Sequence, residues 1–143
     1  MRMSLVQNRS AELWRSFRPL AQHVEGRVGD DFFSVQIYDN PDYFSAYNPE
    51  REFTRWAAIE FGEGAEVASG LQPLILPEGE YAVFDYQGLP SEFGTFAREI
   101  YSRILPQAGK KPDDRPHYEI IGPAYRPDDP SAEETICIPV CKI

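Results

Sequence analysis

Hydrophobic residues in the first half of the chain recur at two different spacings. Over residues 10–24 they return every three or four positions, which is the period of an α-helix with one apolar face. Over residues 32–38 and 53–61 they alternate with more polar residues, which is the period of a half-buried β-strand. Alternation places Tyr38 and Trp56 on the face of their strand that carries the polar residues.

The second half shows the same spacings in a fuller order. It predicts a strand over 81–86, a helix over 91–105 and strands over 117–121 and 135–141, with 71–76 as a possible short strand and 110–115 as a charged loop. The first half has only Met1 to Val6 to open the same series, so its first strand is expected to be short, supplied by a neighbouring chain, or missing. Two similar halves of strand, helix, strand and strand fit one domain, residues 1–143.

One acidic residue interrupts a strand that otherwise reads as buried. Glu119 shares a face with His117 and Ile121, because side chains alternate along a strand. A carboxylate in an apolar setting must find a cation or hydrogen bonds, or take up a proton, so Glu119 is a candidate ligand-binding residue. The alternative is a structural carboxylate paired with Arg115, Arg126 or the N-terminal arginines. A lone histidine at a strand start is more often exposed, so His117 is assigned no catalytic role.

The charge of the chain bears on its partners. The net charge is −9, although residues 1–29 carry five Arg against two Glu. An acidic surface repels phosphate and favours cationic solutes, so nucleic acid is not an expected partner. No apolar run approaches the roughly 20 residues that span a bilayer, and the first residues lack the apolar core of a signal peptide. A cytoplasmic protein without a membrane partner is expected.

Both cysteines lie in the last predicted strand, at Cys137 and Cys141. Four residues of strand separate them by about 13 Å, which excludes a disulfide in that conformation. With His23 and His117 as the only histidines, the chain has no metal-ligand spacing. No metal and no other cofactor is expected.

Several blocks in a fixed order resemble the GyrI-like small-molecule-binding domain, the effector-binding domain of many AraC-type and multidrug-sensing MerR-type bacterial regulators. The order of the blocks is specific, whereas each block alone is weak. They are Gly79 to Gly88, a helix ending in Leu105-Pro106, Arg115 to Glu119 and Glu134 to Val140, with Ala11 to Phe17 and Phe53 to Glu60 in the first half. Residues 1–29 supply at most one helix and no helix-turn-helix module, so a stand-alone version is expected.

The resemblance implies an antiparallel α+β fold with two pseudo-symmetric halves, helices on one face of the sheet and a ligand cleft on the other. It also implies that Glu119 faces this cleft among aromatic side chains and serves large, flat, often cationic molecules. Relatives often carry Trp where this chain has Ile104 and an aromatic residue where it has Cys137, so the pocket is expected to be roomier.

The expected ligand-binding residues combine one carboxylate with aromatic walls. In the strand over 81–86, alternation leaves two aromatic-containing faces open, Tyr81 with Val83 or Phe84 with Tyr86, and the second is chosen. The candidate ligand-binding residues are Glu119, Trp56, Tyr38, Phe84, Tyr86 and Cys137.

Two functions compete on these residues. The first is a non-enzymatic binding protein for hydrophobic, often cationic, aromatic small molecules, in which stacking and cation–π contacts give breadth and Glu119 selects charge. The second is a hydrolase of cyclopropane-bearing or other reactive natural products, as one branch of the family is reported to be; no residue is assigned firmly as catalytic, and Glu119 takes that role if the protein is a hydrolase. A regulatory protein partner is a third, weaker expectation.

Overall fold

The computed structural model describes residues 1–143, apart from the side chain of Pro41. Within the described residues, seven strands form one open antiparallel sheet. The strands are β1 (Arg2–Met3), β2 (Phe32–Ile37), β3 (Phe53–Ala58), β4 (Tyr81–Gln87), β5 (Lys110–Pro112), β6 (His117–Ile121) and β7 (Glu133–Lys142). The helical elements are α1 (Ser10–Ala21), η1 (Pro41–Phe44), η2 (Pro90–Glu92), α2 (Phe93–Glu99), the π turn η3 (Ile100–Ile104) and α3 (Leu105–Gln107).

The strand order shows the two halves directly. From edge to edge it is β1-β3-β2-β6-β7-β4, with β5 paired to the far end of β7. In each half the first strand lies at the edge, the third lies next to it and the second lies at the centre, where β2 pairs with β6. The predicted α+β fold is confirmed, and the opening strand is short rather than missing.

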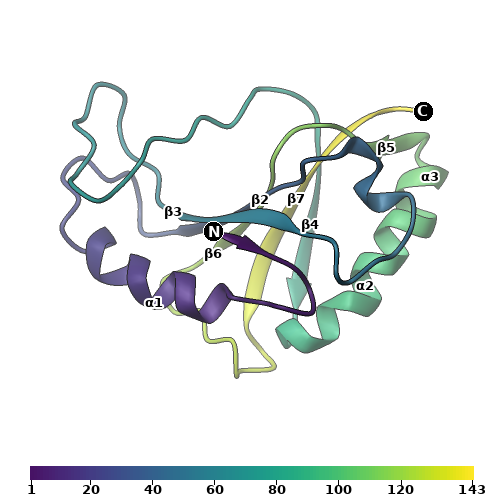
Figure 1. Ribbon diagram of the computed structural model, residues 1–143, viewed down its shortest axis with the longest axis horizontal. Helices are drawn as coiled ribbons and strands as arrows, with labels where there is room; N and C mark the ends of the chain where they lie inside the picture. Colours follow the sequence, from purple (N-terminus) through teal and green to yellow (C-terminus); the bar gives the residue numbers. More distant parts are fainter.

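Both helices cover the same face of the sheet. Phe17 and Ala21 of α1 pack on Ala57 of β3, and Ile100 at the end of α2 packs on Ile136 of β7. Register carries this face across the sheet, because residues directly opposite in an antiparallel pair point to the same side. One continuous row runs Ala57, Ser34, Glu119, Ile136, Phe84. Figure 1 shows α1 and α2 at opposite sides of the molecule, with the strands between them.

Two segments differ from the sequence prediction. Residues 71–76 form no strand, because Pro73 and Pro77 lack the amide hydrogen that a strand would donate; the segment belongs to a long connection between β3 and β4. Residues 110–112, expected as a loop, form β5. Helix α1 ends at Ala21, three residues early, two residues after Pro19 removes a backbone donor from its last turn.

Candidate functional site

Buried polar residues gather on the helix-bearing face of the sheet, where β2 and β6 meet between the two helices. Ser34, Gln36 and His117 are 1%, 4% and 5% exposed. Glu119 lies directly opposite Ser34 and is partly buried. The centre of this face, between α1 and α2, therefore carries polar side chains, whereas the parts of the face under the helices carry apolar ones. We call this group of residues, together with Arg55 and Glu134, the central polar strip.

Glu119 has a cation nearby but no direct bond to it. Its carboxylate makes no hydrogen bond or ion pair of 4 Å or less to another described residue. Burial raises its pKa, and the positive charge of Arg55 partly opposes that shift. Arg55 Nη1 instead donates to Ser34 Oγ at 2.6 Å, and Arg55 Nε is buried without a partner among the described residues.

The alternative pairing considered for Glu119 does not occur. Arg115 donates to Asp113 at 2.8 Å, and Arg2 and Arg9 pair with other carboxylates. The cation whose charge acts on the pKa of Glu119 is Arg55 on β3, a residue that the sequence analysis did not select.

A second carboxylate belongs to the same strip. Glu134, on β7, lies opposite Ile121 of β6. It is the diagonal neighbour of Glu119 and points to the same face of the sheet. Burial raises its pKa to about 8, with further contributions from the charge of Glu119. Two carboxylates face one guanidinium, so the strip lacks positive charge when both are ionised.

Aromatic rings adjoin the strip at the His117 end. The Phe44 ring stacks on the Tyr101 ring with centroids 4.5 Å apart and on His117 at 5.0 Å, and Tyr38 meets His117 edge to face at 4.8 Å. Tyr101 Oη lies 3.3 Å from His117 Nδ1. Burial lowers the pKa of His117 to about 3, so the imidazole is neutral at physiological pH.

The structure brings four of the six predicted ligand-binding residues to one face. Glu119 belongs to the central polar strip and Tyr38 borders it, held in the ring cluster by Phe44 and Tyr43. Phe84 and Tyr86 lie on the same face but pack into the core against α2, where Tyr86 Oη donates to the Leu89 carbonyl at 2.8 Å.

Trp56 and Cys137 lie on the opposite face. A second row runs Trp56, Val35, Tyr118, Cys137, Val83. The interpretation that Trp56 shares a face with Glu119 is therefore wrong: Ala57 occupies that side of β3, since both Ala57 and Glu119 lie opposite Ser34. The expectation that Glu119 points away from the helices is wrong for the same reason.

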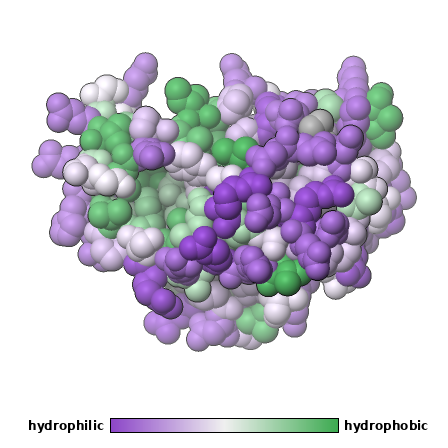
Figure 2. Space-filling view, in the orientation of Figure 1, coloured by the Kyte–Doolittle hydropathy of each residue, from purple (hydrophilic) through white to green (hydrophobic). Residues whose placement is uncertain are grey.

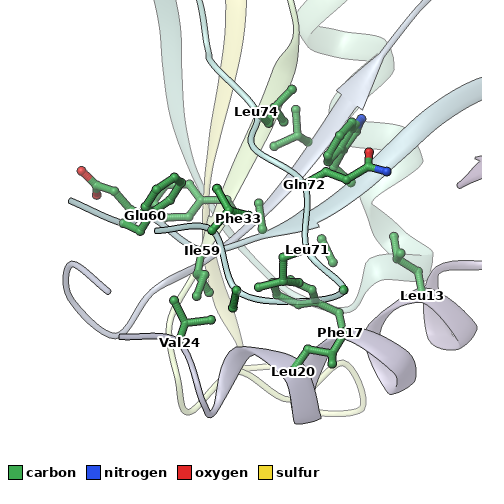
Figure 3. Close-up of a pocket in the computed structure, with 18 of the residues that line it drawn as sticks. Leu13, Phe17, Leu20, Val24, Phe33, Ile59, Glu60, Leu71, Gln72 and Leu74 are labelled. Carbon is green, nitrogen blue, oxygen red and sulfur yellow. The ribbon is translucent and has the colours of Figure 1, made fainter. Parts of the chain in front are cut away.

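Trp56 lines a separate apolar cavity of about 670 Å³. Figure 3 shows side chains of α1 and of the connection between β3 and β4 converging on it, including Phe17, Leu20 and Leu71. Glu119 is not among its lining residues.

Sequence reasoning missed Arg55, Glu134, Phe44 and Tyr101. The sequence could have indicated Glu134, because a final strand that began one residue earlier would have included it, on the same face as Ile136. The other three come together only through tertiary contacts between β3, η1 and the helical run after β4.

None of the helices in the described part of the chain is both long and apolar enough to cross a membrane.

No curated protein matched the chain. The family model of the GyrI-like small-molecule-binding domain matches residues 8–140, a range that includes α1, α2, the strands from β2 to β6, most of β7 and the central polar strip. With this match over nearly the whole chain, together with the paired strand-helix-strand-strand halves, the protein belongs to the GyrI-like small-molecule-binding-domain family.

Proposed function

We propose that this domain binds hydrophobic, ring-bearing cations at the central polar strip, between α1 and α2. The observation that carries the proposal is the Glu119 carboxylate, which lies at the centre of the helix-bearing face without a direct cationic partner among the described residues. Small-molecule binding itself follows from the family.

Electrostatics favours a cation over an anion or a neutral ligand. The pKa values of Glu119 and Glu134 are raised, which means that the positive charge of Arg55 does not fully offset the cost of burying their ionised carboxylates. A bound cation would supply the missing charge and stabilise the ionised carboxylates. The overall charge of −9 acts in the same direction by raising the local concentration of cations.

The neighbouring rings favour a flat ligand. Tyr38, Phe44 and Tyr101 offer faces and edges within one cluster, and each cation–π or stacking contact contributes about 0.5–2 kcal/mol. Such contacts tolerate differences in ligand shape, so the charge of the ligand, rather than its scaffold, would set selectivity.

Titration of rhodamine 6G into the wild type, Glu119→Gln and Glu133→Gln tests this function. Glu119→Gln should weaken binding by roughly tenfold or more, the effect of losing about 1.4 kcal/mol or more of charge interaction. Glu133 is exposed and adjacent to Glu134, so Glu133→Gln removes the same charge away from the strip and should leave affinity nearly unchanged. Equal affinity in all three proteins would show that Glu119 does not recognise the cation.

Hydrolysis of a strained electrophile is a second candidate, favoured by one observation. A carboxyl group whose pKa is raised by burial, as that of Glu119 is, keeps its proton to higher pH than an ordinary carboxyl group and is better suited to give it to a leaving group. Incubation with a cyclopropane-bearing alkylator, followed by mass spectrometry, separates the two functions. Product formed over many turnovers by the wild type and lost in Glu119→Gln would favour the enzyme, whereas recovery of unchanged compound supports binding alone.

A further inference from the structure

The apolar cavity beside Trp56 adjoins the central polar strip only at Arg55, and Glu119 is not among its lining residues. It lies at the β3 side of the sheet, where Val35, Trp56 and Ala58 line it from one face and Ala57 lines it from the helix-bearing face, and its outer wall is the connection between β3 and β4. Its volume of about 670 Å³ is within the range of roughly 300–1,000 Å³ typical of small-molecule sites.

We propose that this cavity is a second ligand site, which takes uncharged lipophilic molecules. The proposal goes beyond the cation site and does not depend on it, because Trp56 and Glu119 point to opposite faces of the sheet.

The lining decides the class of ligand. Apolar side chains of α1, β2 and the connection build most of its walls: Leu13, Phe17, Leu20, Phe33, Leu71 and Leu74. Figure 3 shows these apolar side chains around the cavity while the Glu60 carboxylate points away from it. An apolar molecule gains free energy by leaving water for such a site, whereas a charged one would lose hydration without a counter-charge.

The charged residues near the cavity strengthen this preference. Arg55 is a lining residue, but its guanidinium donates to Ser34 on the helix-bearing face and lies 5.4 Å from the Phe53 ring. Glu60 and Glu66 are exposed at the rim, where their charges repel the carboxylate of a fatty acid. Neutral lipophiles are therefore favoured over anionic ones.

The outer wall is suited to admit a ligand. Between Glu63 and Gly79, the backbone N–H groups that donate hydrogen bonds to backbone carbonyls in the described chain are those of Ala65, to Gly62, and of Leu71, to Ala68. Both hydrogen bonds close local turns. The wall is held to the sheet by side chains such as Leu71, which packs against the α1 cluster. The connection is anchored at its start by the bridge between Phe61 and Arg27, but the part after Glu63 has no strand pairing and can move aside at small cost in backbone hydrogen bonds.

Hydrophobic surface marks the same region from outside. Leu20 and Val67, both cavity-lining residues, are 41% and 42% exposed. Figure 2 shows hydrophobic surface concentrated on the side where Figure 1 places α1 and the connection after β3. A ligand in the cavity would cover part of this surface.

A neutral fluorescent probe, N-phenyl-1-naphthylamine, tests the site. We expect saturable binding by the wild type, with energy transfer from Trp56 measured in a Trp14→Phe background. Ala58→Phe fills the cavity from the β3 side and should weaken binding roughly tenfold or more.

A pair of adjacent residues supplies the matched control. Leu74 lines the cavity, whereas its neighbour Ile75 is 85% exposed. Leu74→Asn should weaken probe binding several-fold, and Ile75→Asn should leave it within about twofold of the wild type. Circular dichroism of each variant confirms that the fold is retained; if Ala58→Phe fails to fold, the Leu74 and Ile75 pair still decides the question.

The two sites are separated by Glu119→Gln and by competition. Probe affinity should be the same in Glu119→Gln, and rhodamine 6G should not displace the probe. The proposal is overturned if the wild type shows no saturable binding, if Leu74→Asn and Ala58→Phe bind as the wild type does, or if Glu119→Gln abolishes binding of both compounds. Tighter binding of laurate than of the neutral probe would overturn the assignment of ligand class.

Discussion

Replacing Glu134 by Gln should stabilise the protein at alkaline pH and not at acid pH. The pKa of Glu134 is about 8 in the folded state, against an ordinary carboxyl value of 4.5. Between these two values the folded protein holds a proton that the unfolded chain has released, so the free energy of unfolding falls as pH rises. Below about 4.5 both states are protonated and the side chain contributes nothing; above about 8 the folded protein carries the full penalty. Glutamine, which cannot ionise, removes that penalty.

The size of the effect has an upper limit set by the shift. A difference of about 3.5 pKa units corresponds to about 5 kcal/mol at 1.36 kcal/mol per unit. The effect should be smaller, because Glu134 is only partly buried and part of its shift comes from the charge of Glu119. We expect about 1–2 kcal/mol at pH 8.5, or an increase in Tm of roughly 3–8 °C for a chain of this size.

Thermal and urea unfolding at pH 5, 6.5 and 8.5, followed by circular dichroism, measures this gain. Groups that face Glu134 and bear on its titration are Glu119 on β6, Arg55 on β3, Tyr86 on β4 and Tyr125 in the connection before β7. Glu133→Gln is the control, since Glu133 is exposed and points to the other face of β7. A gain for Glu134→Gln that is equal at pH 5 and pH 8.5, or no gain at either, would refute the placement of two carboxylates on one buried face.

Two further predictions concern the core and the thiols. Ile100→Ala should lower the free energy of unfolding by about 2–4 kcal/mol in urea titrations, because Ile100 is fully buried. Ile75→Ala, at an exposed position, should change it by less than about 0.5 kcal/mol. Similar losses in both variants would contradict the packing of α2 on β7. Cys141 should react with Ellman's reagent well before Cys137, which is 3% exposed and whose thiol pKa is raised by burial, and equal rates would show that β7 is not buried as described.

The sequence alone determined most of the local structure of this protein. Alternation along 32–38 and 117–121 identified the two central strands, and the three- and four-residue spacing after Ser10 identified α1. These patterns are readable because the period of a strand or a helix depends on the backbone of a few neighbouring residues. The same local rule placed Glu119 inside a strand, and the structure has it in β6, although several of its neighbours on that face, such as Ser34 and His117, are polar. It was less secure where prolines intervene, as in 71–76, and for the short β5.

Only the tertiary structure decided which residues share a face. Alternation shows that Trp56 and Ala57 point to opposite sides of β3, but not which of them lies on the side of Glu119, which is 62 or more residues away in the chain. That choice depends on register between β3, β2 and β6, and a shift of one residue would have exchanged the two faces. The structure placed Ala57 on the same face as the Glu119 carboxylate, with Ser34 between them, and Trp56 on the opposite face. Register depends on what covers each face of the sheet: the helices cover one face, and the β3–β4 connection covers part of the other beside β3, whereas Val83 on β4 stays 61% exposed. No single strand contains that information.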